Sequence, residues 1–366
     1  MKKWLPLFLI SLLAHISFFA QTPTYAISGK IVDAATQLPL QGASVFAQNT
    51  TIGTATGPDG NFKLYLPNGG YDLVVTFTGF QTETRRISTA NGDDKGLVIE
   101  LKQKEKSMED VVIKASNEVK DGWEKYGDFF LANFIGKTSN SKFCTIKNKE
   151  VLKFYYSKKR NRLKVLAGAP LQIENLALGY RIKYELDSFT HEYNTGAGIY
   201  SGYPLFEELT PADETQRNTW NDNRATAYNG SLLHFMRSLY NRRLKDNGFE
   251  IQFLVKYYDN DSALVLRDPY AAMNYYRDDS TNTVEITPNQ PEVALIYKNA
   301  RPSQTYLDAN PDQPGKFQLT VLSFLPGEPI IIEQNGYYYE QASFTINQYL
   351  GWQKMGDMLP YDYKVM

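Results

Sequence analysis

Residues 27–80 alternate between short strand-like segments and turn sequences, and this pattern constrains the fold more than any other feature of the chain. In the segment NFKLYL (61–66) every second residue is apolar, which is the period of a strand with one buried face. The segment GPDG (57–60) suits a type I turn, where proline is favoured at the second position and glycine at the last. About seven short strands at this spacing predict a sandwich of two sheets.

Three motifs lie within the same stretch: GKIVDAATxxPLxGASV at 29–45, TxxDGxF at 56–62 and LPxGxYxLxV at 66–75. Together they resemble the carboxypeptidase-regulatory-like domain. This module is common at the N-termini of outer-membrane receptors and other exported proteins of Bacteroidetes-type bacteria. The resemblance implies a seven-strand antiparallel β-sandwich of the prealbumin (transthyretin) type over residues 26–102. It also implies a non-catalytic role, because the module is the regulatory part of the peptidases that contain it.

The first 20 residues have the three parts of a signal peptide. Lys2 and Lys3 form the charged start, residues 5–13 the apolar run, and Ala20 the small residue before the cleavage site. The apolar run is shorter than the roughly 20 residues of a membrane-spanning helix, so an uncleaved anchor is the less favoured alternative. We therefore expect an exported protein of the periplasm or the outer-membrane periphery of a Gram-negative bacterium, with no transmembrane segment in the mature chain.

The charge balance argues against a nucleic-acid-binding protein, and the cysteine content excludes a protein with internal disulfides. The chain has 39 basic and 40 acidic residues, and this balance argues against a nucleic-acid partner, which calls for a basic surface. Cys144 is the only cysteine, so no intramolecular disulfide can form. Aromatic residues make up 14% of the chain, which favours strands, where flat side chains pack across a pleated face.

After a charged linker at 103–121, residues 122–366 are predicted to form a β-rich α+β region with about two helices. Apolar residues at helical spacing predict one helix from Asp121 that stops at Gly136. A second helix is predicted to begin after Ser231 as its N-cap and to end at Asn247 and Gly248, where glycine suits the left-handed cap. Strands are expected at 151–156, 181–186, 251–257, 263–266, 317–322 and 330–339.

Three short segments of this second region (175–180, 228–234 and 359–363) are similar to uncharacterised segments found with the same module in exported bacterial proteins. That resemblance implies a shared architecture and brings no activity with it.

No arrangement of catalytic residues stands out. A zinc peptidase needs two histidines and a carboxylate as ligands, and His191 and His234 are the only histidines after the leader, without the required spacing. No G-x-S-x-G nucleophile motif occurs. We therefore expect a protein that is not an enzyme, with no catalytic residues, no metal and no cofactor.

Four residues are candidates for contact with a ligand or partner: Tyr200, Tyr203, His234 and Tyr338. Tyr200 and Tyr203 lie in the glycine-rich stretch NTGAGIYSGYP (194–204), which suggests a mobile or ligand-approaching loop, and Tyr338 is the middle of a tyrosine triplet. Tyrosine rings that point outward from a strand can stack on sugars or form a protein contact, and amphipathic packing is the alternative. His234 is also consistent with a hydrogen-bonded residue at the edge of the core.

These observations favour an exported, non-enzymatic binding or accessory protein of the cell envelope that engages a protein or glycan partner. Two alternatives stay open. One is a hydrolase acting on glycans or peptides, with its site near residues 196–203 or His234. The other is a carbohydrate-binding module without turnover.

Overall fold

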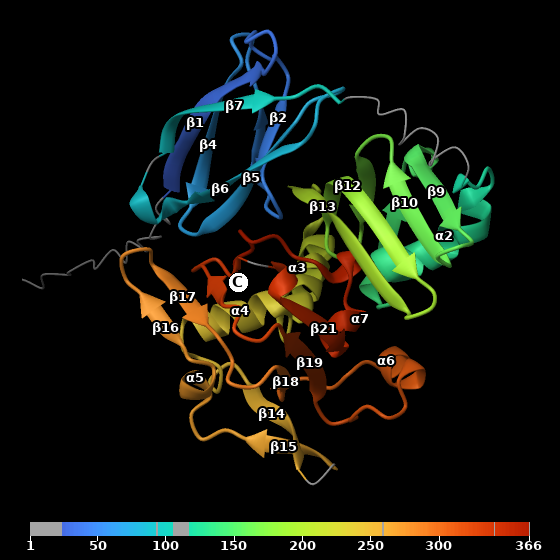
Figure 1. Ribbon diagram of the computed structural model, residues 1–366, viewed down its shortest axis with the longest axis vertical. Coiled ribbons are helices and arrows are strands. Elements are labelled where there is room, and N and C mark those ends of the chain that lie inside the picture. The colour runs from blue at the N-terminus through green and yellow to red at the C-terminus, as the bar shows by residue number, and fades with distance from the viewer. Residues whose placement is uncertain (1–23, 93, 105–116, 258–259, 340, 366) are drawn as a thin grey trace, which may run out of the picture.

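The computed structural model describes residues 24–92, 94–104, 117–257, 260–339 and 341–365. The predicted signal peptide (1–20) and most of the predicted linker (103–121) lie outside these residues. The described chain is mainly β, as predicted, and its buried apolar side chains form three clusters. Figure 1 shows the corresponding parts in blue, in green, and in yellow to red.

The first cluster belongs to the predicted β-sandwich. Its two sheets have the strand orders β4-β1-β7 and β3-β2-β5-β6, and every second residue of β4 is buried between them. One pair differs from the antiparallel expectation, because β1 and β7 run parallel. The strands are β1 (Thr24–Asp33), β2 (Ser44–Ala47), β3 (Gly53–Ala55), β4 (Asn61–Pro67), β5 (Gly70–Thr76), β6 (Glu83–Ser88) and β7 (Asp94–Leu101).

The second cluster lies between helix α2 (Gly122–Phe134) and a six-stranded sheet. The helix follows Asp121 and ends before Gly136, as predicted, and the rings of Phe130 and Phe134 pack against the sheet. The strand order is β8-β11-β12-β10-β9, and β13 pairs with the free side of β12. The strands are β8 (Cys144–Ile146), β9 (Leu152–Ser157), β10 (Arg162–Ala167), β11 (Leu171–Asn175), β12 (Tyr180–Glu192) and β13 (Ala197–Glu208).

Two helices connect this sheet to the last part of the chain. Helix α4 (Leu232–Tyr240) begins after Ser231, whose hydroxyl accepts from the backbone N–H of His234, as the sequence predicted. It ends at Tyr240, before the predicted end at Asn247 and Gly248. Helix α3 (Glu214–Tyr228) was not predicted, because its sequence is mostly polar. Its start does carry a signal, since the Asp213 carboxylate accepts from the N–H of Gln216 three residues later.

The third cluster packs α4 against two further sheets, with strand orders β15-β14-β18-β19-β21 and β16-β17-β20. Together with α2, α3 and α4, the short helices here exceed the two helices expected. The strands are β14 (Phe249–Tyr257), β15 (Asn260–Val265), β16 (Tyr276–Asp278), β17 (Thr283–Ile286), β18 (Glu292–Tyr297), β19 (Gln318–Phe324), β20 (Ile330–Ile332) and β21 (Phe344–Gln348), and the helices α5 (Pro269–Ala272), α6 (Gln304–Ala309) and α7 (Tyr349–Trp352).

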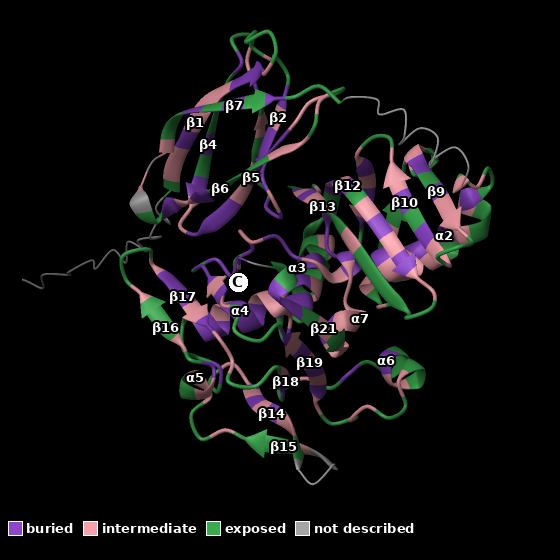
Figure 2. Cartoon of the chain, in the orientation of Figure 1, coloured by how far each residue is buried: buried purple, intermediate pink, exposed green. Residues whose placement is uncertain are grey.

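The sandwich is fastened to the rest of the protein by the turn between β2 and β3. The N–H of Asn49 donates to the carbonyl of Pro204 at 2.7 Å, and the N–H of Phe206 donates to the carbonyl of Thr50 at 2.8 Å. Asn49 and Thr50 are 8% and 0% exposed, so this turn is buried in the interface (Figure 2). Backbone pairing of this kind fixes the position of the turn against β13.

The end of the chain holds the other side of the same turn. The N–H of Tyr361 donates to the carbonyl of Asn49 at 2.7 Å, and the carboxylate of Asp362 accepts from the N–H of Thr51 at 3.0 Å. Arg237 of α4 in turn holds the end of the chain, because its guanidinium donates to the carbonyls of Tyr361 and Tyr363 at 2.9 and 3.0 Å. The segment 360–363 therefore joins the sandwich to α4.

Candidate functional site

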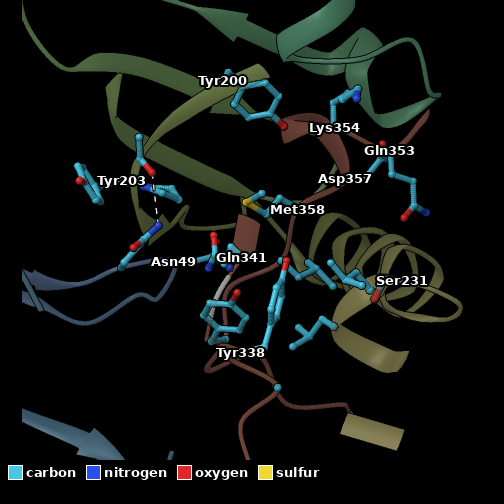
Figure 3. A pocket seen from close by; sticks show the side chains of 18 of the residues that line it. Asn49, Tyr200, Tyr203, Ser231, Tyr338, Gln341, Gln353, Lys354, Asp357 and Met358 are labelled. Carbon is cyan, nitrogen blue, oxygen red and sulfur yellow. Dashed lines mark hydrogen bonds between the residues drawn. The ribbon is translucent and has the colours of Figure 1, made fainter. Parts of the chain in front are cut away.

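A pocket of about 660 Å³ lies where the sandwich meets the rest of the protein, and we call it the junction pocket. This volume falls within the range of 300–1,000 Å³ that is common for small-molecule sites. Its walls come from the sandwich (the β2–β3 turn, β5 and β6), from β12 and β13, from the start of α4, and from residues 336–361. Figure 3 shows side chains from these elements around it.

Five tyrosines line the pocket. Four of them, Tyr184, Tyr200, Tyr203 and Tyr338, have hydroxyls that make no hydrogen bond to any residue that the structure describes. None of these four hydroxyl oxygens is fully covered by protein. Burial raises the pKa of Tyr200 and of Tyr338 to about 12, so both phenols stay protonated and can donate. The lining tyrosines are Tyr184, Tyr200, Tyr203, Tyr338 and Tyr361.

Three of the four residues singled out from the sequence therefore lie around one pocket. Tyr200 and Tyr203 come from β13, whereas Tyr338 follows β20 after a turn that contains Asn335 and Gly336. More than 130 residues separate these two groups along the chain, and the sequence alone gave no reason to bring them together. Whether they contact a ligand stays a prediction.

The glycine-rich stretch before Tyr203 has a different structure from the mobile loop that its sequence suggested. From Ala197 onward it is strand β13, paired with β12 along its length. A Cβ at Gly202 would lie 2.4 Å from Cε1 of Tyr184, so only glycine leaves room for that ring. Gly202 therefore helps to shape the pocket wall by admitting the Tyr184 ring.

His234, the fourth candidate, does not line the junction pocket. Its ring packs among Tyr228, Phe249 and Tyr297, and its Nδ1 accepts from the N–H of Gly230 at 3.1 Å. Burial lowers the pKa of His234 to about 4, which keeps the imidazole neutral near pH 7. In the structure His234 braces the turn before α4.

The charged residues of the lining, among them Lys354 and Asp357, were not found from the sequence. The side chain of Lys354 is partly buried, and burial lowers its pKa. Asp357 accepts from Thr138 at 2.9 Å and from Asn140 at 3.0 Å through one carboxylate oxygen, and burial raises its pKa. Neither residue belongs to a recognisable motif, because their neighbours at the pocket come from distant parts of the chain.

No metal site was found in the part of the chain that the structure describes, where no three His, Cys, Asp or Glu side chains come together as ligands. The pocket offers ring faces, phenolic hydroxyls, one ammonium group and the carboxylates of Asp72 and Asp357. These groups can stack, donate hydrogen bonds and pair with an anion, which is the chemistry of recognition.

Comparison with known families identifies the sandwich. Residues 27–113, about a quarter of the chain, match the family described as CarboxypepD_reg-like domain. Residues 27–113 are a carboxypeptidase-regulatory-like domain. This regulatory-like domain supplies the β2–β3 turn of the junction pocket, and a module of this type is consistent with a non-enzymatic accessory role. No curated protein matches the chain.

Solved structures share only local similarity with the chain. A DUF3823 family protein from Bacteroides ovatus is 12% identical, with 51% of this chain and 82% of that chain covered and a TM-score of 0.19. A putative membrane-associated protein of unknown function from Bacteroides fragilis is 15% identical, with 44% and 64% covered and a TM-score of 0.18. A 3-chlorocatechol 1,2-dioxygenase from Rhodococcus opacus is 11% identical, with 22% and 60% covered and a TM-score of 0.19.

The chain spans between 41% and 60% of the length of four of the matched structures, including the dioxygenase. With TM-scores this low, these similarities say nothing about activity. Separately, none of the described helices is both long and apolar enough to cross a membrane.

Proposed function

We propose that this protein is an exported, non-enzymatic binding protein of the cell envelope, and that it holds a glycan or protein partner in the junction pocket. The observation that carries the proposal is that Tyr200, Tyr203 and Tyr338 all line one pocket between the regulatory-like domain and the rest of the chain. Tyrosines that combine a free hydroxyl with an accessible ring face are common in recognition sites.

The position of the pocket supports the proposal. Sites between structural units are frequent places for ligands, because several elements can contribute groups to one cavity. Here the β2–β3 turn is held on one side by β13 and on the other by residues 360–363. A pocket wall fixed by backbone hydrogen bonds is pre-organised, which reduces the entropy lost when a ligand binds.

A pocket-blocking substitution tests the binding function. Ser201 is an exposed lining residue of the junction pocket, and its hydroxyl donates to Asp187 at 3.0 Å, so Ser201→Trp places an indole at the pocket's rim without entering a hydrophobic core. Thr195→Trp, in the exposed turn between β12 and β13, is the matched control. We expect some members of a panel of oligosaccharides and synthetic peptides to raise the thermal midpoint of the wild type and Thr195→Trp by several degrees. Ser201→Trp should show no such rise.

The proposal fails if no member of the panel shifts the wild type, or if Ser201→Trp responds as the wild type does. Each protein without ligand serves as its own reference, so a change in basal stability does not affect the comparison.

The cell-envelope location needs its own test. Cell fractionation followed by N-terminal sequencing should recover a protein that begins at Gln21 in the periplasmic or outer-membrane fraction. A cytoplasmic protein that retains the leader would contradict this part of the proposal.

A further inference from the structure

Lys354 brings a positive charge to the junction pocket without a partner for it. Among the described residues, no carboxylate lies within ion-pair distance of its ammonium group, and burial is the only cause that lowers its pKa. Burying a charge costs free energy unless the charge is paired. An unpaired and partly buried cation in a cavity therefore indicates a place where an anion from outside can bind.

The acidic residues of the lining do not pair with the ammonium group of Lys354. Asp72 accepts a hydrogen bond of 2.8 Å from the hydroxyl of Tyr337, and Asp357 accepts from Thr138 and Asn140. One oxygen of each carboxylate is thus held by other side chains, whereas the buried Oδ2 of Asp357 has no hydrogen-bond partner in the described chain.

The tyrosines indicate what else the occupant carries. Four phenolic hydroxyls have no partner in the described chain, and each can donate one hydrogen bond and accept others. A ligand that satisfies them needs many donors and acceptors, together with flat apolar faces that pack on aromatic rings. Saccharides have both properties, and the cavity of about 660 Å³ admits several sugar units.

We propose that the occupant of the junction pocket is an acidic saccharide, with its carboxylate paired to Lys354 and its hydroxyls bonded to the tyrosines. This inference rests on the proposed function, since it names the class of ligand that the same pocket holds.

The test uses calorimetric titration of the mature chain with short oligosaccharides of glucuronate, galacturonate or mannuronate. Each acid is compared with its methyl ester, which keeps the shape and removes the charge. We expect at least one acid to bind, and its ester to bind at least tenfold more weakly. Lys354→Gln should lower the affinity for the acid to that for the ester, while its affinity for the ester stays unchanged.

Two further variants show whether the position of the charge matters. Lys354→Arg keeps the charge and should retain part of the preference for the acid. Lys164→Gln removes an exposed lysine of β10, away from the pocket, and should leave both affinities unchanged.

The possible outcomes distinguish a failure of this inference from a failure of the proposed binding function. Equal affinity of the wild type for acid and ester would overturn the acidic ligand and leave the binding function standing. Binding of acidic peptides that depends on Lys354, with no saccharide bound, would overturn the saccharide. Failure of every saccharide and peptide to bind would remove the proposed function itself.

Discussion

The backbone N–H of Tyr361 donates to the carbonyl of Asn49 across 2.7 Å, so the last segment of the chain is bonded to its first domain. Both residues also line the junction pocket. The pocket therefore depends on how the sandwich is attached, and substitutions at the attachment should affect both stability and binding.

Arg237 is the most connected residue of this attachment. Its guanidinium donates to the carbonyls of Asn335, Tyr361 and Tyr363 at 2.9 to 3.0 Å. Arg237→Met leaves three carbonyls without their donor, and we expect the free energy of unfolding to fall by about 2–4 kcal/mol. Urea denaturation of the variant and the wild type measures this change in the free energy of unfolding. The control is Arg217→Met, which removes an exposed pair with Glu214 and should cost less than about 0.5 kcal/mol.

Gly70 lies at the second contact between the sandwich and the rest of the chain. A Cβ there would be 2.4 Å from Cγ of Glu333, which is 2% exposed and has little room to move. Gly70→Ala should therefore destabilise the protein by about 1–3 kcal/mol in the same assay. At Gly168 the nearest atom to an added Cβ is 3.6 Å away, so Gly168→Ala should change stability little. Equal effects of the two substitutions would contradict this view of the contact.

Glu333 should make stability depend on pH. Burial raises the pKa of this carboxyl in the folded protein, although Tyr339 donates a hydrogen bond to it. The folded state then prefers the protonated acid, so this group's contribution to stability is greatest below the unfolded pKa of about 4.3 and declines as pH rises through the folded pKa. Glu333→Gln should gain stability relative to the wild type, by about 1 kcal/mol, as pH rises from the unfolded pKa of about 4.3 through the folded pKa.

Denaturation curves across that pH range test the prediction, with exposed Glu150→Gln as the control. A difference between Glu333→Gln and the wild type that does not change with pH would show that the carboxyl titrates normally.

Lys354 should reduce stability in the absence of a ligand. Because burial lowers its pKa, the charged form is disfavoured in the folded protein, and this cost is present at neutral pH and disappears as pH rises toward the unfolded pKa of about 10.4. Lys354→Met should raise the free energy of unfolding at pH 7 by on the order of 1 kcal/mol. Lys164→Met should leave it unchanged, and a loss of stability in Lys354→Met would argue that the ammonium has a partner.

Local patterns predicted the parts of the fold that depend on local chemistry. The alternation in residues 61–66 predicted β4, and the N-cap at Ser231 predicted the start of α4. Helix α3 was missed because only four of its residues are buried and its face toward the core includes an arginine. The parallel pairing of β1 with β7 depends on contacts between distant strands, which no local pattern encodes.

Ligand contact by the candidate residues stays a prediction, and the sequence singled out only some of the residues that line the junction pocket. Tyr200, Tyr203 and Tyr338 stood out as aromatic residues in unusual local sequence, and all three line the junction pocket. Lys354 and Asp357 did not stand out in the sequence. They differ from other charged residues by being buried beside residues that are far away in the chain. His234 stood out as a rare residue type, although its neighbours in the fold are mostly aromatic packing partners.

The central claim is that the junction pocket holds a ligand in the cell, and photo-cross-linking from within the pocket tests it most directly. A benzophenone amino acid replaces Ser201 in one variant and Thr195 in another, each produced with its leader in cells that make the protein naturally. We predict that irradiation yields a discrete adduct of higher mass from position 201 and none from position 195, and that Tyr203→Ala reduces the yield at 201. No adduct at position 201, or equal adducts at both positions, would contradict the account.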